Sequence, residues 1–378
     1  MTGHEGSATS SSGASVAIGR PRPRWAGWIG WVTRLALGLL PLLLTFLFTT
    51  LILLLAGAPP LEAYRQIVEG AFGQASTRAD ILVAWVPLLL GSAGLMITFT
   101  AGLWNIGVEG QIIAGALVAA WVARSLDLPP LLLIPLLLLG GLVGGAFWGL
   151  GVGLLKVYGQ VHEIFGGLGM NFIAQALTIY LIFGPWKPAR GATMSGTEPF
   201  PPAAWLPRLG NLRVSPLTVI LAIVLTAVVY VALRDTVWGL QLKAIGRNMR
   251  AAYLMGLPTH RLMLMAFILG GALAGLVGAI QATGVDHRLI PQVSRGYGFL
   301  ALLVVLLSGF RLAWVPPIAF FIAAIGVGSP RLELRMGLDS SLGGILEGSL
   351  VLFFLLARGL RLRLSRPKET LTDAAPET

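Results

Sequence analysis

Cysteine is absent from this sequence of 378 residues, and charge is scarce, since only 11% of the residues are Asp, Glu, Lys or Arg. Without cysteine the chain has no disulfide, no thiol nucleophile and no thiolate metal site. Soluble domains carry roughly 25% charged residues, so this composition excludes an ordinary soluble protein. Hydrophobic residues make up 56% of the chain, and the mean hydropathy is +0.81. The composition therefore indicates an integral membrane protein.

The sequence motifs of common catalytic and metal sites are also missing. No Gly-x-x-x-x-Gly-Lys-Ser/Thr phosphate loop occurs, so we expect that this polypeptide does not itself bind or hydrolyse ATP. There is no His-Glu-x-x-His pattern, no cluster of His and carboxylates with metal-ligand spacing, and no Gly-x-Ser-x-Gly nucleophile elbow. We therefore expect a protein that is not an enzyme, with no catalytic residue, no metal and no cofactor.

Long apolar runs are what the sequence has instead. Several reach 18 residues or more, which is enough to cross a hydrocarbon core about 30 Å thick, and their solid aliphatic content indicates helices. In one run, four glycines at four-residue spacing, from Gly141 to Gly153, predict close helix packing. The predicted fold class is all-α and polytopic, with about ten transmembrane helices near residues 35–57, 80–102, 105–122, 130–157, 164–183, 215–233, 262–283, 298–307, 313–327 and 342–360.

Polar segments at both ends bound one predicted membrane domain, residues 34–361. Residues 1–33 are predicted to be a disordered basic tail and residues 362–378 a second tail, both cytoplasmic. Ten spans that begin inside place the loop 234–261 in the cytoplasm and the long loop 184–213 outside. A modest excess of Lys and Arg on the cytoplasmic side agrees, so the net charge of +11 indicates membrane orientation rather than nucleic-acid binding. We expect a multi-pass membrane protein.

A charged segment, residues 234–258, interrupts the apolar runs. On a 3.6-residue period its cations Lys243, Arg247 and Arg250 lie on one helix face. The opposite face carries Leu242, Ile245, Met249, Ala252, Tyr253 and Gly256. This pattern predicts a short amphipathic helix that lies at the membrane surface. Such a helix either rests on anionic lipid headgroups or binds a partner protein.

The clearest polar cluster near the membrane spans is the segment Trp104–Gln111, Trp-Asn-Ile-Gly-Val-Glu-Gly-Gln. Polar groups inside a bilayer are expensive, at roughly 2.5–3.5 kcal/mol for an acid at a helix centre, so they are retained where they have a role. The glycines around Glu109 could break a helix and expose polar groups to a cavity. Alternatively, Glu109 simply caps a helix. The pair His162-Glu163 favours a structural hydrogen bond over a proton relay.

These segments together resemble the ABC importer permeases of the branched-chain amino acid, simple sugar and nucleoside family. The string from Lys243 to Asn248, Lys-Ala-Ile-Gly-Arg-Asn, followed by Gly-Leu-Pro, resembles the cytoplasmic coupling loop of that family. The segment Asn105–Gln111 resembles a hallmark of its nucleoside-type branch, whose partners are BMP-type binding proteins; Trp104 stands where Phe is usual. Three further segments resemble the family in order: His162-Glu163 through Asn171, Gly296-Tyr297-Gly298-Phe299, and Ile345–Leu350.

The resemblance implies a type II ABC importer permease of the bacterial cell membrane. In that family two permeases, identical or related, pair on ATPase subunits, and an extracytoplasmic solute-binding protein delivers the cargo. The cargo is expected to be a nucleoside or a simple sugar. The expected residues that couple to the ATPase are Leu242, Lys243, Ala244, Gly246, Arg247, Asn248, Ala251, Ala252 and Gly256. The expected substrate path contains Trp104, Asn105, Glu109, Gln111 and Asn171.

Other functions remain open on the sequence. An ion-coupled secondary transporter or a channel would need no ATPase, but such proteins usually carry intramembrane charges, and only Glu109, Glu163 and Glu347 are near the spans. A permease for branched-chain amino acids is a second alternative. A membrane enzyme is a third, against which the missing catalytic motifs argue.

Overall fold

The computed structural model describes residues 40, 43–189, 196–337 and 341–364, and it contains no strand within these ranges. The all-α prediction is therefore confirmed for the described chain. The predicted tail 1–33 lies outside the described residues, as does most of the predicted tail 362–378; residues 362–364 form the end of the last helix.

Among the described residues, six helical segments are long and apolar enough to cross a membrane. They are α3 (Ala75–Thr100), α5 (Pro130–Val157), α6 (Glu163–Phe183), α7 (Pro216–Asp235), Thr259–Asp286, which comprises α10 (Thr259–Ile280) and η2 (Gln281–Asp286), and Leu312–Met336, which comprises η3 (Leu312–Trp314), α12 (Val315–Gly328) and α13 (Pro330–Met336). The helix Leu43–Leu55 and α2 (Pro60–Phe72) form a pair bent by 110°, which makes a seventh span if it is counted as one.

Three other helices lie in regions where the sequence predicts spans: α4 (Val108–Ser125), α11 (Tyr297–Leu307) and α14 (Ser341–Leu364). By length and composition the described chain thus has six spans, or up to seven, where the sequence predicts about ten. Four predicted spans are therefore not among the six: the first run, which turns sharply into α2; α4; α11, which is only 11 residues long; and α14, whose apolar part is Ser341–Ala357.

Glycines hold the centre of the bundle together, where α4, α5 and α10 meet. A Cβ atom added to Gly115 would lie 2.1 Å from the carbonyl oxygen of Gly275, and one added to Gly145 would lie 2.1 Å from that of Gly271. No side chain larger than hydrogen fits between these backbones, which is the close approach that small residues allow. The packing role predicted for the glycine stripe is confirmed.

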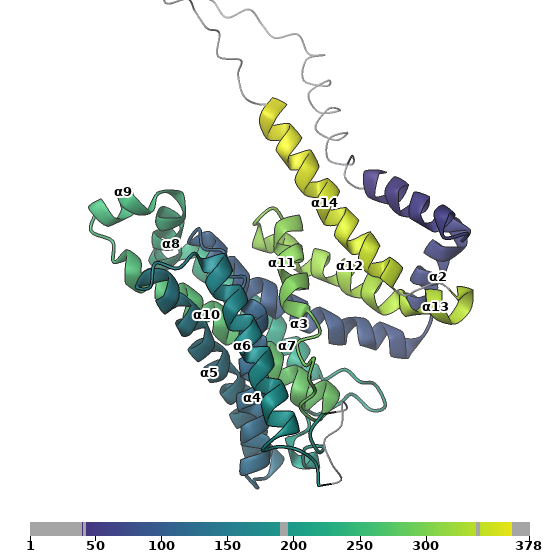
Figure 1. Cartoon of the computed structure of the whole chain (residues 1–378), viewed down its shortest axis with the longest axis horizontal. Helices are drawn as coiled ribbons and strands as arrows, with labels where there is room; N and C mark the ends of the chain where they lie inside the picture. The colour runs from purple at the N-terminus through teal and green to yellow at the C-terminus, as the bar shows by residue number, and fades with distance from the viewer. Residues whose placement is uncertain (1–39, 41–42, 190–195, 338–340, 365–378) are drawn as a thin grey trace, which may run out of the picture.

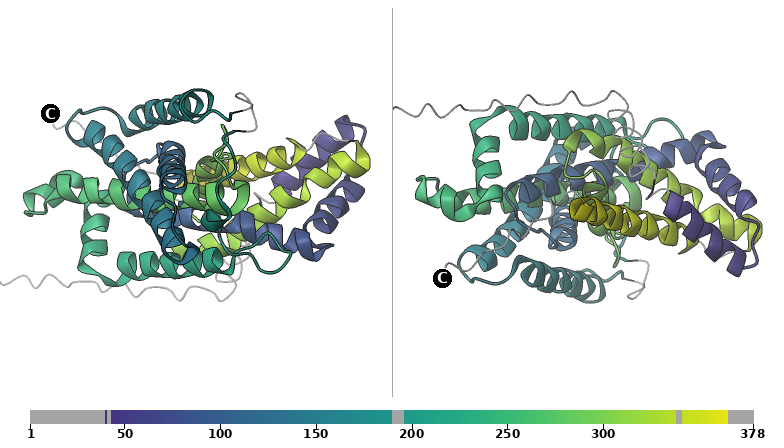
Figure 2. Two further views of the ribbon diagram at one scale, coloured as in Figure 1. Left: turned by 90° about the horizontal axis from the view of Figure 1, so that it is seen from below. Right: turned by 90° about the horizontal axis from the view of Figure 1, so that it is seen from above.

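The helices form a bundle with a smaller group beside it. In Figure 1, α8 (Val237–Arg247) and α9 (Met249–Leu254) project from one end of the bundle, and the loop before α7 lies at the opposite end. In both views of Figure 2, α6 and α7 lie on opposite flanks of the bundle, and the group of α2, α12 and α13 extends away from it to one side.

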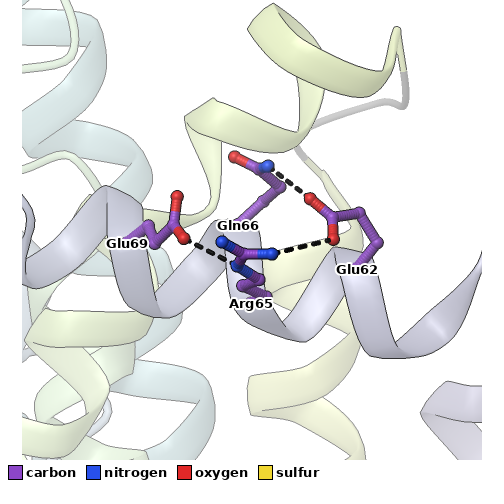
Figure 3. A network of polar contacts seen from close by, with 4 residues as sticks. All are labelled: Glu62, Arg65, Gln66 and Glu69. Atoms are coloured by element: carbon purple, nitrogen blue, oxygen red, sulfur yellow. Dashed lines mark hydrogen bonds and ion pairs between the residues drawn. The ribbon is translucent and has the colours of Figure 1, made fainter.

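Within this side group, α2 packs on α12 through small residues. A Cβ on Gly70 would lie 2.6 Å from the carbonyl oxygen of Gly328 in α12. On its open face, Arg65 Nε donates to Glu69 at 2.7 Å and Gln66 donates to Glu62 at 2.6 Å (Figure 3). Pairs spaced by four residues stabilise a helix by about 0.2–0.5 kcal/mol each, so this network supports α2 locally.

Candidate functional site

The segment predicted as one amphipathic helix is two helices, so that prediction is wrong in this respect. The helix α8 ends at Arg247 and α9 begins at Met249, with Asn248 in an extended conformation between them. Asn248 Oδ1 accepts a hydrogen bond from the Ala251 amide at 3.0 Å. An Asn side chain that satisfies a free amide in this way starts a new helix, and this explains the break.

The break also decides which residues face the protein. Leu242, Ile245 and Ala252 are buried, as the helical period predicts. Met249 and Tyr253, predicted on the same face, are 41% and 65% exposed. Beyond Asn248, Ala252 keeps the predicted burial but Met249 and Tyr253 do not, because the second helix starts in a new direction.

A groove of about 620 Å³ runs along the exposed side of α8 and α9. Six of the nine predicted coupling residues line it: Lys243, Ala244, Arg247, Asn248, Ala251 and Ala252. Leu242 and Gly256 do not line the groove: Leu242 is buried, and Gly256, which follows α9, has a left-handed conformation with φ +83°. The groove is largely apolar with exposed cations at its rim, so it suits a partner segment that carries apolar and acidic side chains.

Gly246, the ninth predicted coupling residue, touches the end of α3. A Cβ on Gly246 would lie 2.3 Å from the carbonyl oxygen of Thr100, and one on Gly102 would lie 3.1 Å from the Gly246 Cα. Gly102 itself has φ +73°, a conformation that favours glycine. Backbone therefore rests on backbone where α8 meets the turn that leads to Trp104.

Asn105 and Gln111 lie just beyond that turn and form a closed pair. Each side-chain amide donates to the other at 3.0 Å, and both residues are 0% exposed. Two complementary amides satisfy each other inside a protein, so neither requires water.

Glu109 joins this pair to a distant part of the chain. Its carboxylate accepts hydrogen bonds from the amides of Gly296 at 3.0 Å and Gly298 at 2.7 Å. These amides belong to the first turn of α11, where a carboxylate is favourable. The helix cap that the sequence offers as one interpretation is present, but Glu109 caps α11 rather than its own helix.

Asn171 of α6 completes the polar cluster. It accepts from the Gly110 amide at 2.8 Å and donates to the Ile106 carbonyl at 2.9 Å. The four polar residues predicted for the substrate path are thus neighbours, with their polar atoms bonded within the chain. The fifth, Trp104, is 39% exposed and packs edge-on against Phe99, with ring centroids 5.1 Å apart.

The comparison with known proteins decides the family. Residues 77–355 match the family described as "Branched-chain amino acid transport system / permease component". The chain belongs to this family. It is accordingly a non-catalytic component of an ABC transporter and a multi-pass membrane protein.

Several relatives are similar over most of their length. The "Glucose ABC transporter permease protein TsgB13" of Haloferax volcanii is 32% identical over 78% of this chain and 80% of its own. The "Guanosine ABC transporter permease protein NupP" of Bacillus subtilis is 26% identical over 89% of this chain and 98% of its own. The solved structure "PsaBC from Streptococcus pneumoniae in complex with Fab" matches 79% of this chain and 99% of that chain, with 14% identity and a TM-score of 0.48.

The permease has a second polar region that sequence reasoning missed, at the end of the bundle opposite α8. The His287 ring stacks on Trp205 with centroids 4.3 Å apart, contacts Arg208, and bonds through Nδ1 to the Thr283 carbonyl at 2.8 Å. Burial, reinforced by Arg208, lowers the pKa of His287. One signal was visible in the sequence: Gln281, Asp286 and His287 follow directly after an apolar run.

The pair at the start of α6 has the structural role that the sequence favours. His162 Nδ1 accepts from the Ile164 amide at 3.4 Å and so caps α6. The neighbouring Glu163 carboxylate is paired with Lys156. Both contacts fix the turn between α5 and α6.

Proposed function

We propose that this permease forms the translocation path of an ABC importer for a nucleoside or a simple sugar, and that a separate ATPase drives it through α8 and α9. The observation that carries the proposal is the groove on these two helices, which stands free at one end of the bundle. A free, mainly apolar groove with a cationic rim is a surface that a second protein can fill.

The coupling has a direct physical route. A push on α8 acts on the turn after α3, because Gly246 and Thr100 are in backbone contact. That turn leads to Asn105 and Gln111, and Glu109 beside them holds the first turn of α11. ATP binding and hydrolysis would shift the balance between two packings of these elements, which is how a remote motor opens one side of a path. The predicted substrate path remains the set Trp104, Asn105, Glu109, Gln111 and Asn171. In this proposal these residues form the part of the path wall that moves.

The remaining partners follow from the family. A second permease, identical or related, would complete the path, and an extracytoplasmic solute-binding protein would deliver the cargo. Lipid surrounds the spans. We further propose that α8 and α9 and both termini are cytoplasmic, and that the short or bent helices bring the number of membrane crossings to about ten.

Two observations guide the choice of cargo. The printed names of the relatives include glucose, guanosine and nucleosides. The segment Asn105–Gln111 favours a nucleoside, and the exposed ring of Trp104 could stack on a base. A branched-chain amino acid is the second candidate, because the description of the family names it.

Reconstituted transport tests the proposal. The permease, co-purified with its ATPase and supplied with its binding protein, is expected to take up guanosine or glucose only when ATP is present. Gly246→Trp and Arg247→Glu are expected to abolish ATP-driven uptake, whereas Lys187→Glu, an exposed residue on the loop before α7, serves as the matched control. Uptake that needs no ATP and follows an ion gradient would instead establish a secondary transporter, and uptake of leucine alone would establish the amino-acid alternative.

A further inference from the structure

A cavity of about 340 Å³ lies beside the loop before α7, the loop that Figure 1 shows at the end of the bundle opposite α8 and α9. Five segments line it: α3, the loop before α7, η2, the start of α11 and the junction of α12 and α13. Small-molecule sites begin at about this volume. Its polar lining consists of Asp80, Arg208, Arg213, Gln281, Arg295 and Tyr297. None of these residues belongs to the polar cluster around Glu109.

Gln281 is the unusual member of this lining. It is 1% exposed, and its amide nitrogen has no hydrogen-bond partner. A buried donor without a partner is destabilising and uncommon in folded proteins, so its presence requires an explanation. Gln281 also begins η2, a six-residue π-helix, and such segments occur frequently at functional sites.

Only some of the charged side chains that line the cavity have a polar partner. Arg295 is paired with Asp286, and Arg208 is turned toward His287. Within the described ranges, Asp80 and Arg213 take part in no ion pair. The cavity therefore offers one carboxylate acceptor, one guanidinium donor, the Gln281 amide and the Tyr297 phenol.

This set favours an uncharged ligand that both donates and accepts hydrogen bonds. A cation would be repelled by the three arginines, and an anion would be attracted by them but repelled by Asp80, so an uncharged ligand is the one that meets no repulsion. A hydroxyl group can donate to a carboxylate while it accepts from a guanidinium or an amide. A compact molecule with several hydroxyls uses all of these groups at once.

We propose that this cavity binds the sugar ring of the cargo, either a free monosaccharide or the ribose of a nucleoside, with Gln281 as the buried donor to a ring or hydroxyl oxygen. Its role as an outer binding site for cargo rests on the proposed importer function. The binding itself does not, because it can be measured without ATP and without transport.

Equilibrium dialysis on the full-length permease with its ATPase, in nanodiscs, tests the proposal. The probes are radiolabelled D-glucose, guanosine and inorganic phosphate. We expect glucose or guanosine to bind with a Kd on the order of 1 mM or tighter, and phosphate not to compete. Gln281→Leu is expected to weaken binding by about 10-fold while raising the unfolding temperature by about 2 °C, because it removes an unpaired donor.

Gln175→Leu is the matched control, since its amide donates to the Pro291 carbonyl at 2.7 Å. It should lower the unfolding temperature and leave the affinity unchanged. Asp80→Asn and Arg213→Gln should each weaken binding about 10-fold, whereas the exposed Asp127→Asn and Lys187→Gln should not.

Three results would overturn the assignment: no saturable binding of either solute, unchanged affinity in Gln281→Leu, or competition by phosphate, which would make the cavity an anion site. None of them would affect ATPase co-purification or the loss of coupling in Gly246→Trp. Conversely, a permease that binds glucose but recruits no ATPase would retain this site and lose the importer function.

Discussion

The centre of the bundle is packed through glycines, whereas the α8–α9 pair is held by polar side chains. In the centre, glycines bring three helix backbones into direct contact, so these helices are close-packed and cannot shift without a clash. In α8 and α9, two short helices are held by side-chain caps at Thr236 and Asn248, and most of their surface is open. The difference teaches that a tightly packed body and a pair of open, short helices lie side by side, and that the backbone at Gly246 and Thr100 joins α8 closely to α3.

The largest effect should come from filling the centre. In Gly275→Val, the new side chain would meet the Gly141 carbonyl oxygen at 2.1 Å and the Gly145 backbone at 2.6 Å. We expect a loss of at least about 3 kcal/mol in the free energy of unfolding, because backbone cannot move aside as a flexible side chain can. Thermal unfolding in detergent measures it.

Gly169→Val is the control for this variant, because nothing lies within 4 Å of the added Cβ. Gly169→Val should fold normally. If Gly275→Val unfolds at the same temperature as Gly169→Val, the centre is not stiff and the comparison fails.

Glu109 should show the next largest effect, because it joins the polar cluster to α11. Glu109→Ala leaves the amides of Gly296 and Gly298 without their acceptor and should cost about 3 kcal/mol, because each of the two bonds to a charged group contributes roughly 1.5 kcal/mol at the lower end of its usual range. Glu109→Gln retains an acceptor and should cost less than half as much. Chemical denaturation of both variants, with hydrogen exchange at Gly298, measures the difference; equal losses would mean that the charge is irrelevant.

Breaking the cap between α8 and α9 should have a moderate and local effect. Asn248→Ala removes the acceptor for the Ala251 amide and should destabilise α9 by about 1 kcal/mol. Hydrogen exchange is expected to speed up at Ala251 while protection in the centre stays constant. Asn248→Asp keeps the cap and should match the parent protein. Faster exchange throughout the bundle would show that the two regions are not separable.

The smallest effect is the pH dependence of stability that comes from His287, at the end of the bundle opposite α8. Burial lowers the pKa of His287 below the ordinary value of about 6.5, so the unfolded chain binds a proton first as the pH falls. The contribution of the neutral ring to the free energy of unfolding is fully present above about pH 6.5 and decreases below that pH. The decrease should be less than about 1 kcal/mol, because the site is partly open to water. His287→Gln cannot titrate and should flatten the unfolding temperature between pH 7 and pH 5; an unchanged slope would contradict the assignment.

Several features were predictable because they depend on neighbours in the sequence. Hydropathy indicated a helical membrane protein, the glycine spacing indicated close packing in α5, and the order of motifs indicated the permease family, which the match over residues 77–355 confirms. The amphipathic period predicted a surface helix at α8 and the burial of Leu242 and Ile245. The amphipathic period did not predict the break at Asn248, because periodicity assumes an unbroken helix. The hydrogen bond from the Ala251 amide to the Asn248 side chain starts a second helix there.

The sequence by itself determined the class of protein, the positions of most helices and the identity of the polar residues, because hydropathy and helical periodicity are local properties. Only the tertiary structure decided how those polar groups pair: Glu109 bonds to the Gly298 amide 189 residues away. It also decided that the amide nitrogen of Gln281 would be left without a partner in a cavity assembled from five separate segments. The physical reason is that hydrogen-bond partners and cavities depend on how distant helices pack, and no spacing along one helix specifies that arrangement.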